Sequence, residues 1–180
     1  MFRFVDGKVN IRLPGFGVEG TWEPDDRERD AAWELYVELV ARIAIVELRP
    51  EEGSLREALS SLYSVFATTR EILRKYGPTV GRPNRRSDVS FGYVAVMVLN
   101  DILRPVLAKW HPLLLDYENK RDANTSSIEH ETRWSSASDL RRCLNDVRLN
   151  MVDYANVLAE VANVPKLHTQ GRSDPQESLR

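Results

Sequence analysis

Arg104 and His111 are the two residues whose types and spacing most suggest catalytic chemistry. A histidine can transfer protons near neutral pH, and a nearby arginine can stabilise the negative charge that develops on a phosphate. Cleavage of RNA without a metal ion needs both a proton transfer and a cation beside the reacting phosphorus. We therefore treat Arg104 and His111 as candidate catalytic residues.

The pair resembles the motif of the HEPN family of helical ribonucleases, in which an arginine is followed after a short gap by a histidine. Six residues separate Arg104 from His111, which is the upper edge of the family's spacing, and Pro105 stands where the family usually has a small polar residue. The resemblance implies that His111 acts on the 2′-hydroxyl or the leaving group while Arg104 stabilises phosphate charge. A structural role is the other interpretation, and the one we favour, because a histidine between Trp110 and Pro112 often caps or packs a helix.

Arg82, Arg85 and Arg86 form a basic cluster around Asn84. Arginine suits both phosphate and carboxylate partners, so the cluster is a candidate binding site for RNA or for an acidic protein. No aromatic residue is interleaved with these arginines, as a surface for single-stranded nucleic acid would require. A solvated loop is the alternative interpretation.

The sequence predicts no metal site and no cofactor. His130-Glu131 begins like a zinc-protease signature, but Trp134 stands where the second histidine ligand is needed. Cys143 is the single cysteine, so the chain has neither a disulfide within it nor a CxxC pair. Together with an amino-terminal stretch that lacks the apolar core of a secretory signal, this predicts a reducing, cytoplasmic setting.

Composition predicts one globular domain. The chain has 180 residues, of which 42% are hydrophobic and 29% charged, and its net charge of −2 provides no global basic field for nucleic acid or anionic lipid. The most apolar run, Phe91 to Leu99, is roughly half the ~18 residues of a membrane helix. We expect this run to be a buried helix, with no membrane partner.

The apolar pattern predicts an all-α fold, a mostly antiparallel four-helix bundle with a small amino-terminal β-hairpin. Apolar residues recur at helical spacing, and capping residues set the boundaries. Residues 2–13 alternate around Asp6-Gly7, which favours a tight hairpin turn. The helices are expected from Asp25 or Asp26 to about Leu48, from Ser54 to Gly77-Pro78, from Ser87 or Asp88 to about Tyr117, and from Ser136–Asp139 to Pro165.

Three further expectations follow from the same pattern. Pro105 should kink or break the third helix, because proline donates no backbone hydrogen bond. Residues 119–135 are polar and predict a long, mobile connection. The chain thus divides into a hairpin and glycine-rich loop (1–24), a helical bundle (25–164) and a disordered tail (165–180). Its core aromatics are expected to include Trp22, Trp33, Tyr36, Tyr63, Phe66, Phe91, Trp110 and Tyr154.

Three functions are compatible with these patterns. We favour a non-enzymatic protein–protein interaction module, a subunit, adaptor or regulator that binds another protein or a second copy of itself, because no coherent catalytic set is present and the apolar faces are wide. The first alternative is a HEPN-like, metal-independent endoribonuclease acting as a toxin or defence effector through Arg104 and His111. The second is a nucleic-acid-binding helical subunit that uses Arg82, Arg85 and Arg86.

Overall fold

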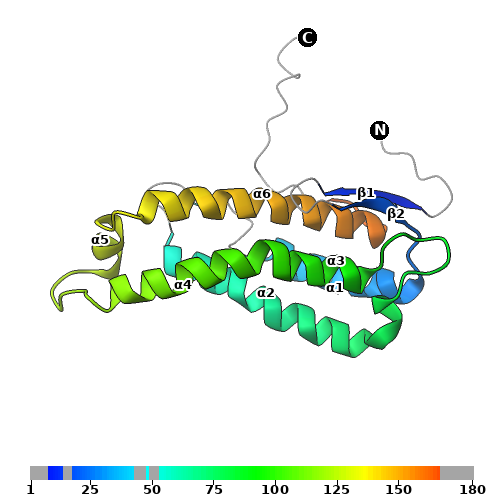
Figure 1. Ribbon diagram of the computed structural model, residues 1–180, viewed down its shortest axis with the longest axis horizontal. Coiled ribbons are helices and arrows are strands. Elements are labelled where there is room, and N and C mark those ends of the chain that lie inside the picture. The colour runs from blue at the N-terminus through cyan, green and yellow to red at the C-terminus, as the bar shows by residue number, and fades with distance from the viewer. Residues whose placement is uncertain (1–7, 14–17, 43–47, 49–52, 167–180) are drawn as a thin grey trace, which may run out of the picture.

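The computed structural model is mostly helical, with a two-stranded hairpin near the amino terminus (Figure 1). It describes residues 8–13, 18–42, 48 and 53–166. The strands are β1 (Val9–Leu13) and β2 (Val18–Trp22). The helical elements are α1 (Asp26–Val40), α2 (Leu55–Tyr76), the 3-10 helix η3 (Gly77–Gly81), α3 (Phe91–Met97), the π-helix η4 (Val98–Leu103), α4 (Arg104–Glu118), α5 (Ser127–Thr132) and α6 (Ala137–Val161).

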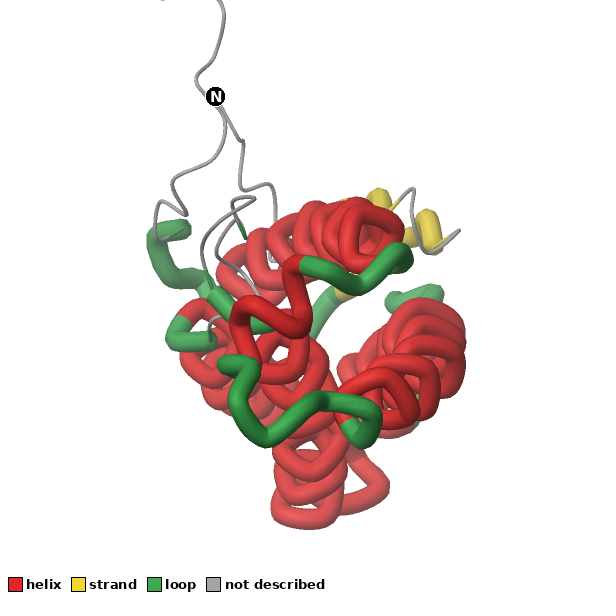
Figure 2. The backbone as a smooth tube through the Cα atoms, turned by 90° about the vertical axis from the view of Figure 1, so that its left-hand side faces the viewer, coloured by secondary structure: helices red, strands yellow, loops and turns green. Residues whose placement is uncertain are grey.

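The long helices lie side by side, along the horizontal in Figure 1 and nearly end-on in Figure 2. α1 packs against both α6 and α2, α2 packs against α4, and β1 lies over α6. Their apolar faces meet in one core, in which Leu35, Leu59, Leu103 and Leu158 are almost completely buried. Burial of these faces removes apolar surface from water and is the main force that holds the helices together.

A buried carboxylate joins the start of α1 to the start of α3. The Asp25 carboxylate caps α1 by accepting a hydrogen bond from the backbone N–H of Glu28. In return, the Glu28 carboxylate accepts a hydrogen bond from the backbone N–H of Asp25. The same Glu28 side chain, only 3% exposed, also accepts the backbone N–H of Phe91 at 2.9 Å. One carboxylate therefore satisfies donors at two helix amino termini, where the helix dipoles also favour negative charge.

A small two-stranded amino-terminal hairpin is present, as expected, and its strands are β1 and β2. β1 is antiparallel to β2, with Val9 opposite Trp22, and Ile11 and Trp22 are buried. The proposed turn at Asp6-Gly7 and the strand before it lie outside the described residues. Asp88 fixes β2 to the loop before α3, because its backbone N–H donates to Thr21 O and its carboxylate accepts the Thr21 N–H.

The predicted boundaries of the second and fourth helices are confirmed within a few residues, whereas the first and third helices differ from expectation. Ser54 caps α2, and Gly77, with φ of 73°, ends it. α1 ends at Val40 rather than near Leu48, with residues 43–47 outside the described part. The third helix begins at Phe91, after the cap Ser90, rather than at Ser87 or Asp88.

We expected Pro105 to kink or break the third helix; the break is wrong, and the kink stays a prediction. Helical backbone continues from Phe91 to Glu118, and the π-helix η4 precedes Pro105, which lies in the first turn of α4. Proline is tolerated there because the wider π turn changes the hydrogen-bond partners just before it. This 28-residue helix is long and apolar enough to cross a membrane, a test that the core helix of a globular bundle also passes, and 44% of its most apolar window is buried.

The polar segment 119–135 is not a long unstructured connection, because it contains α5. Tyr117 stacks on His130, with ring centroids 4.1 Å apart, and on Trp134, with centroids 5.5 Å apart. Glu131 accepts the backbone N–H of Leu55 at the start of α2. His130 and Glu131 were expected in a solvated loop. Instead they contact Tyr117 on α4 and the backbone at the start of α2, and so hold α5 against these two helices.

The expected aromatic core is correct in part. Trp22, Tyr36, Phe91, Trp110 and Tyr154 are buried. The prediction is wrong for Trp33 and Tyr63, which are 46% and 60% exposed. Phe66 is half-buried and packs against the core. Tyr63 and Phe66 both lie on the surface of α2 that faces α4.

We predict that Glu28→Gln changes how stability depends on pH. Burial raises the pKa of Glu28 above its ordinary value of 4.5, although hydrogen bonds from the backbone N–H groups of Phe91 and Asp25 oppose the rise. Glu28 therefore loses its proton at a lower pH in the unfolded chain than in the folded protein. As a result, the contribution of Glu28 to the free energy of unfolding falls as pH rises from 4.5 through the folded-state pKa. Urea denaturation from pH 4 to 7 should show wild type losing stability relative to Glu28→Gln as pH rises.

Glu71→Gln is the control, because Glu71 is exposed on α2. A stability difference between wild type and Glu28→Gln that is constant, or that grows in favour of wild type with pH, contradicts the prediction.

Candidate functional site

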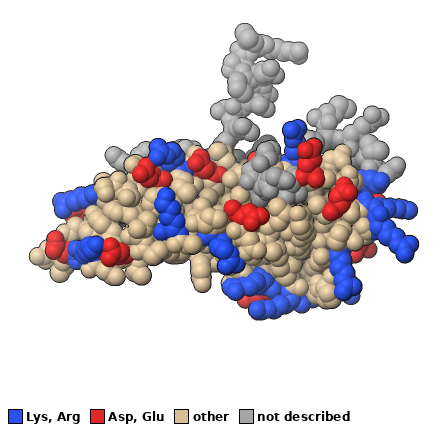
Figure 3. Space-filling view, in the orientation of Figure 1, with Lys and Arg blue, Asp and Glu red and all other residues tan. Residues whose placement is uncertain are grey.

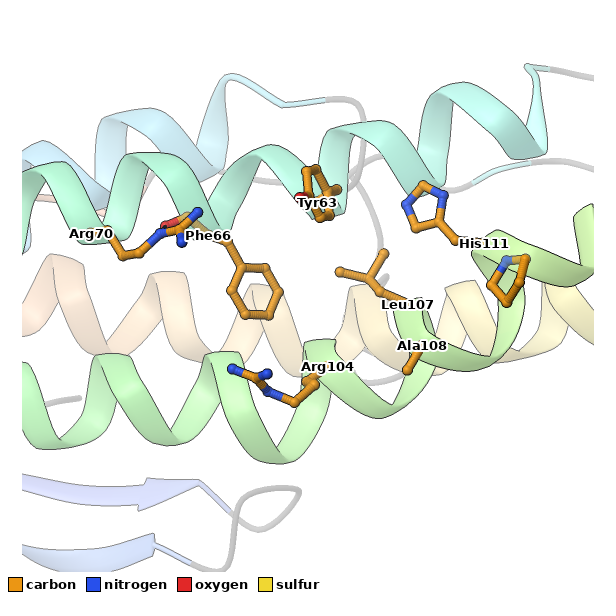
Figure 4. Close-up of a pocket in the computed structure, with 8 residues that line it drawn as sticks. Tyr63, Phe66, Arg70, Arg104, Leu107, Ala108 and His111 are labelled. Atoms are coloured by element: carbon orange, nitrogen blue, oxygen red, sulfur yellow. Dashed lines mark hydrogen bonds between the residues drawn. The ribbon is translucent and has the colours of Figure 1, made fainter. Parts of the chain in front are cut away.

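An open pocket of about 580 Å³ lies between α2 and α4 and contains both residues singled out from the sequence (Figure 4). Arg104 and His111 are seven residues apart on α4, which is close to two helical turns, so both lie on the face toward α2 and are separated by about 10 Å along the axis. The spacing thus brings them to one pocket without bringing them into contact. The lining comprises Tyr63, Phe66, Arg70, Arg104, Leu107, Ala108, His111 and Pro112.

Two rows of polar residues with the same spacing line the α2–α4 contact. Seven-residue intervals keep side chains on one helix face, because two turns of helix take about seven residues. The helices are antiparallel here, since the start of α2 meets the end of α4. The row on α2 is Arg56, Tyr63 and Arg70, and the row on α4 is Arg104, His111 and Glu118.

One end of these rows is closed by an ion pair. Arg56 donates to both Glu118 oxygens, from Nε at 3.0 and 3.1 Å and from a terminal nitrogen at 2.7 Å. The remaining terminal nitrogen of Arg56 lies 2.9 Å from Nδ1 of His111. Both members of the pair are about one-third exposed, so the pair mainly fixes geometry and contributes modestly to stability.

The contact with Arg56 determines which tautomer His111 adopts. Arginine has donors but no acceptor, so Nδ1 of His111 accepts the bond and the neutral ring carries its proton on Nε2. That Nε2 atom is buried and has no hydrogen-bond partner among the residues that the structure describes. The His111 and Tyr63 rings contact each other nearly at right angles, with centroids 5.7 Å apart and planes at 83°.

The surroundings keep His111 neutral. Its pKa lies below the ordinary value of 6.5, first because burial disfavours the imidazolium and second because the Arg56 charge is close, while Glu118 acts in the opposite direction. As a proton acceptor, His111 would have to release Arg56 from Nδ1. The described arrangement thus suits an N–H donor better than a general base.

Arg104 and Arg70 lie at the other end of the pocket. Arg104 donates from Nε and a terminal nitrogen to the side-chain oxygen of Asn100, at 3.2 and 2.9 Å, and its guanidinium lies 5.8 Å from the centre of the Phe66 ring. Arg70 donates from Nε to the backbone carbonyl of Phe66 at 3.1 Å. Both arginines are exposed and are oriented by neutral groups.

The basic loop lies apart from this pocket. Arg82, Arg85 and Arg86 are exposed, and Arg86 forms an ion pair with Glu23 at 3.4 Å. Asn84 donates to the backbone carbonyl of Glu23, so the loop holds the end of β2. RNA binding by these arginines stays a prediction. No group of three or more His, Cys, Asp or Glu residues suited to a metal ion occurs within the described ranges.

Sequence reasoning found Arg104 and His111 but missed Arg56, Tyr63 and Arg70. The signal that identifies these three is their seven-residue spacing, which matches that of Arg104, His111 and Glu118. Comparison of the chain with protein-family models, with curated proteins and with solved structures finds no match.

We predict opposite effects of two substitutions on the pKa of His111. Arg56→Met should raise it, because a neighbouring positive charge is removed, but only part of the way to 6.5, because burial is the larger cause. Glu118→Gln should lower it further. NMR titration of the histidine ring protons measures both, and a fall in Arg56→Met would contradict the assignment of the Arg56 contact.

Proposed function

We propose that this chain is a non-enzymatic helical interaction module, a subunit, adaptor or regulator of a larger assembly, that binds another protein through the groove between α2 and α4. The single observation that carries this proposal is the exposed aromatic and cationic lining of the groove. Tyr63 is 60% exposed there beside Phe66 and Arg104. Tyrosine and arginine are the residue types that most often dominate binding energy at protein interfaces.

The helical frame supports this role. We propose that the four long helices act as a mostly antiparallel bundle whose third helix bends near η4, and that this frame holds the groove open in a fixed shape. More than half of the most apolar window of the helix from Phe91 to Glu118 is not buried, and Leu113 and Leu115 are 47% and 53% exposed. These two leucines are two positions apart on α4 and point to different sides of the helix, so they offer separate apolar contacts rather than one continuous face.

Other features are consistent with the same proposal. The neutral, Arg56-bound state of His111 favours a binding contact over proton transfer. Cys143 is half-buried on α6 and fits the proposed reducing, cytoplasmic setting.

The test is quantitative native co-purification followed by mass spectrometry. The tagged full chain should enrich a partner, and Tyr63→Ala should reduce its recovery by about tenfold or more, since truncation of an interface tyrosine often costs that much affinity. Arg142→Glu is the matched control, because Arg142 is exposed on α6, away from the groove. Equal recovery with Tyr63→Ala and wild type would overturn the use of this groove.

The endoribonuclease remains the second candidate, and one observation favours it, namely that Arg104 and His111 line the same open pocket. In that reaction the 2′-hydroxyl loses its proton and attacks the neighbouring phosphorus, the bond from phosphorus to the 5′-oxygen breaks, and the leaving 5′-oxygen takes up a proton. His111 would transfer one of these protons while Arg104 stabilises the phosphate charge. His111 would first have to exchange its Arg56 contact for the substrate.

We expect purified protein to leave RNA intact in buffer that contains a metal chelator, as the interaction module predicts. Gel electrophoresis of total RNA after prolonged incubation measures this. Cleavage by wild type that is lost in both His111→Ala and Arg104→Ala would replace our proposal with the ribonuclease.

A further inference from the structure

The two ends of the α2–α4 groove differ in charge balance. At one end Arg56 is neutralised by Glu118. At the other end Arg70 and Arg104 line the same pocket, no acidic residue lines that pocket, and neither guanidinium forms an ion pair with a carboxylate among the described residues. Two cations without a counter-charge thus face one open groove.

These two arginines are also held in place before any partner binds. Asn100 uses its side-chain oxygen to fix Arg104, and the carbonyl of Phe66 fixes Arg70. Each arginine has five N–H donors, and these contacts occupy only two on Arg104 and one on Arg70. Donors fixed in this way bind a carboxylate with little further loss of side-chain entropy.

The floor between the arginines is apolar. Phe66, Leu107 and Ala108 line it, and Leu107 is buried against the core. A side chain of leucine or phenylalanine size on a partner would bury its surface here. The groove therefore combines an apolar contact with a positive rim.

We propose that the groove binds an acidic segment of a partner protein, which places one apolar side chain against Phe66, Leu107 and Ala108 and its carboxylates on Arg70 and Arg104. This inference rests on the proposed interaction function and specifies its partner. Charge complementarity carries it, because a carboxylate on each arginine restores the balance that Glu118 provides at the other end.

A peptide fits this groove better than single-stranded RNA. The Arg104 guanidinium lies over the Phe66 ring, and the Tyr63 and His111 rings contact each other nearly at right angles, so these rings do not form a parallel series on which successive bases would stack. Lys and Arg side chains gather along the lower edge of the view in Figure 3, where α2 lies, but much of the face is uncharged.

The test is selection of random 16-residue peptides, displayed on phage, against the immobilised full chain. We expect enriched peptides to carry several Asp or Glu residues around a Leu, Phe or Trp. Fluorescence polarisation of one labelled, enriched peptide should show binding weakened at least about tenfold by the double variant Arg70→Glu/Arg104→Glu. Binding should also weaken as salt concentration rises.

The matched control is the double variant Arg27→Glu/Arg142→Glu, which makes the same charge change at exposed positions on α1 and α6 outside the groove and should leave peptide affinity unchanged. Circular dichroism of both variants checks that they remain folded. Enriched peptides without acidic residues, whose binding needs Tyr63 but not Arg70 or Arg104, would overturn the acidic partner while leaving the interaction function in place. Tighter binding of a labelled 16-nucleotide RNA than of any peptide, lost on the Arg70/Arg104 reversal, would overturn both.

Discussion

The ion pair of Arg56 with Glu118 fixes how α2 and α4 align along their contact. The pair involves three donor–acceptor contacts, and the same guanidinium reaches His111. Its position sets the register of the two antiparallel helices, because Tyr63 then faces His111 and Arg70 and Arg104 come to one pocket. A shift by one turn would separate these groups by about 5 Å. The shape and charge of the groove thus follow from one polar contact at its end.

A second polar junction holds the other end of the molecule. Glu28 links α1 to α3 through Asp25 and Phe91, and Asp88 links the loop before α3 to β2 through Thr21. Both carboxylates accept backbone N–H groups that would otherwise lack partners, which makes them costly to replace. Because the helix that carries Arg104 begins at Phe91, this junction also fixes where the groove begins.

Local signals explain which parts of the fold were predictable. The caps at Asp25 and Ser54 and the apolar stripe of α6 depend on residues close in sequence, and the sequence predicted each of them. The pairing of β1 with β2 accompanies burial of Trp22 in the core, and short-range turn signals do not report on such burial. The exposure of Tyr63 was missed for a similar reason, since periodicity marks a helix face but not whether a neighbour covers it.

The same distinction applies to the site. Arg104 and His111 were found because residue type and spacing along one helix suffice to place them on one face. Arg56 was missed because only the antiparallel packing of α2 brings it to His111, 55 residues away in sequence. Pro105 by itself predicted a kink or break in the third helix. The helical backbone is not broken, because η4 leads directly into α4, and this continuity keeps Arg104 and His111 on one helix.

The chemistry of His111 decides between binding and catalysis as the use of this groove. A histidine that acts as a base needs a free ring nitrogen, and here Nδ1 is occupied by Arg56 while Nε2 carries the proton. Proton transfer would therefore require breaking a contact that shares its arginine with Glu118. Binding of an acidic segment requires no such change, because Arg70 and Arg104 already have free donors directed by neutral groups. The free arginine donors at one end and the Arg56-bound histidine at the other support the docking function that we propose for the groove.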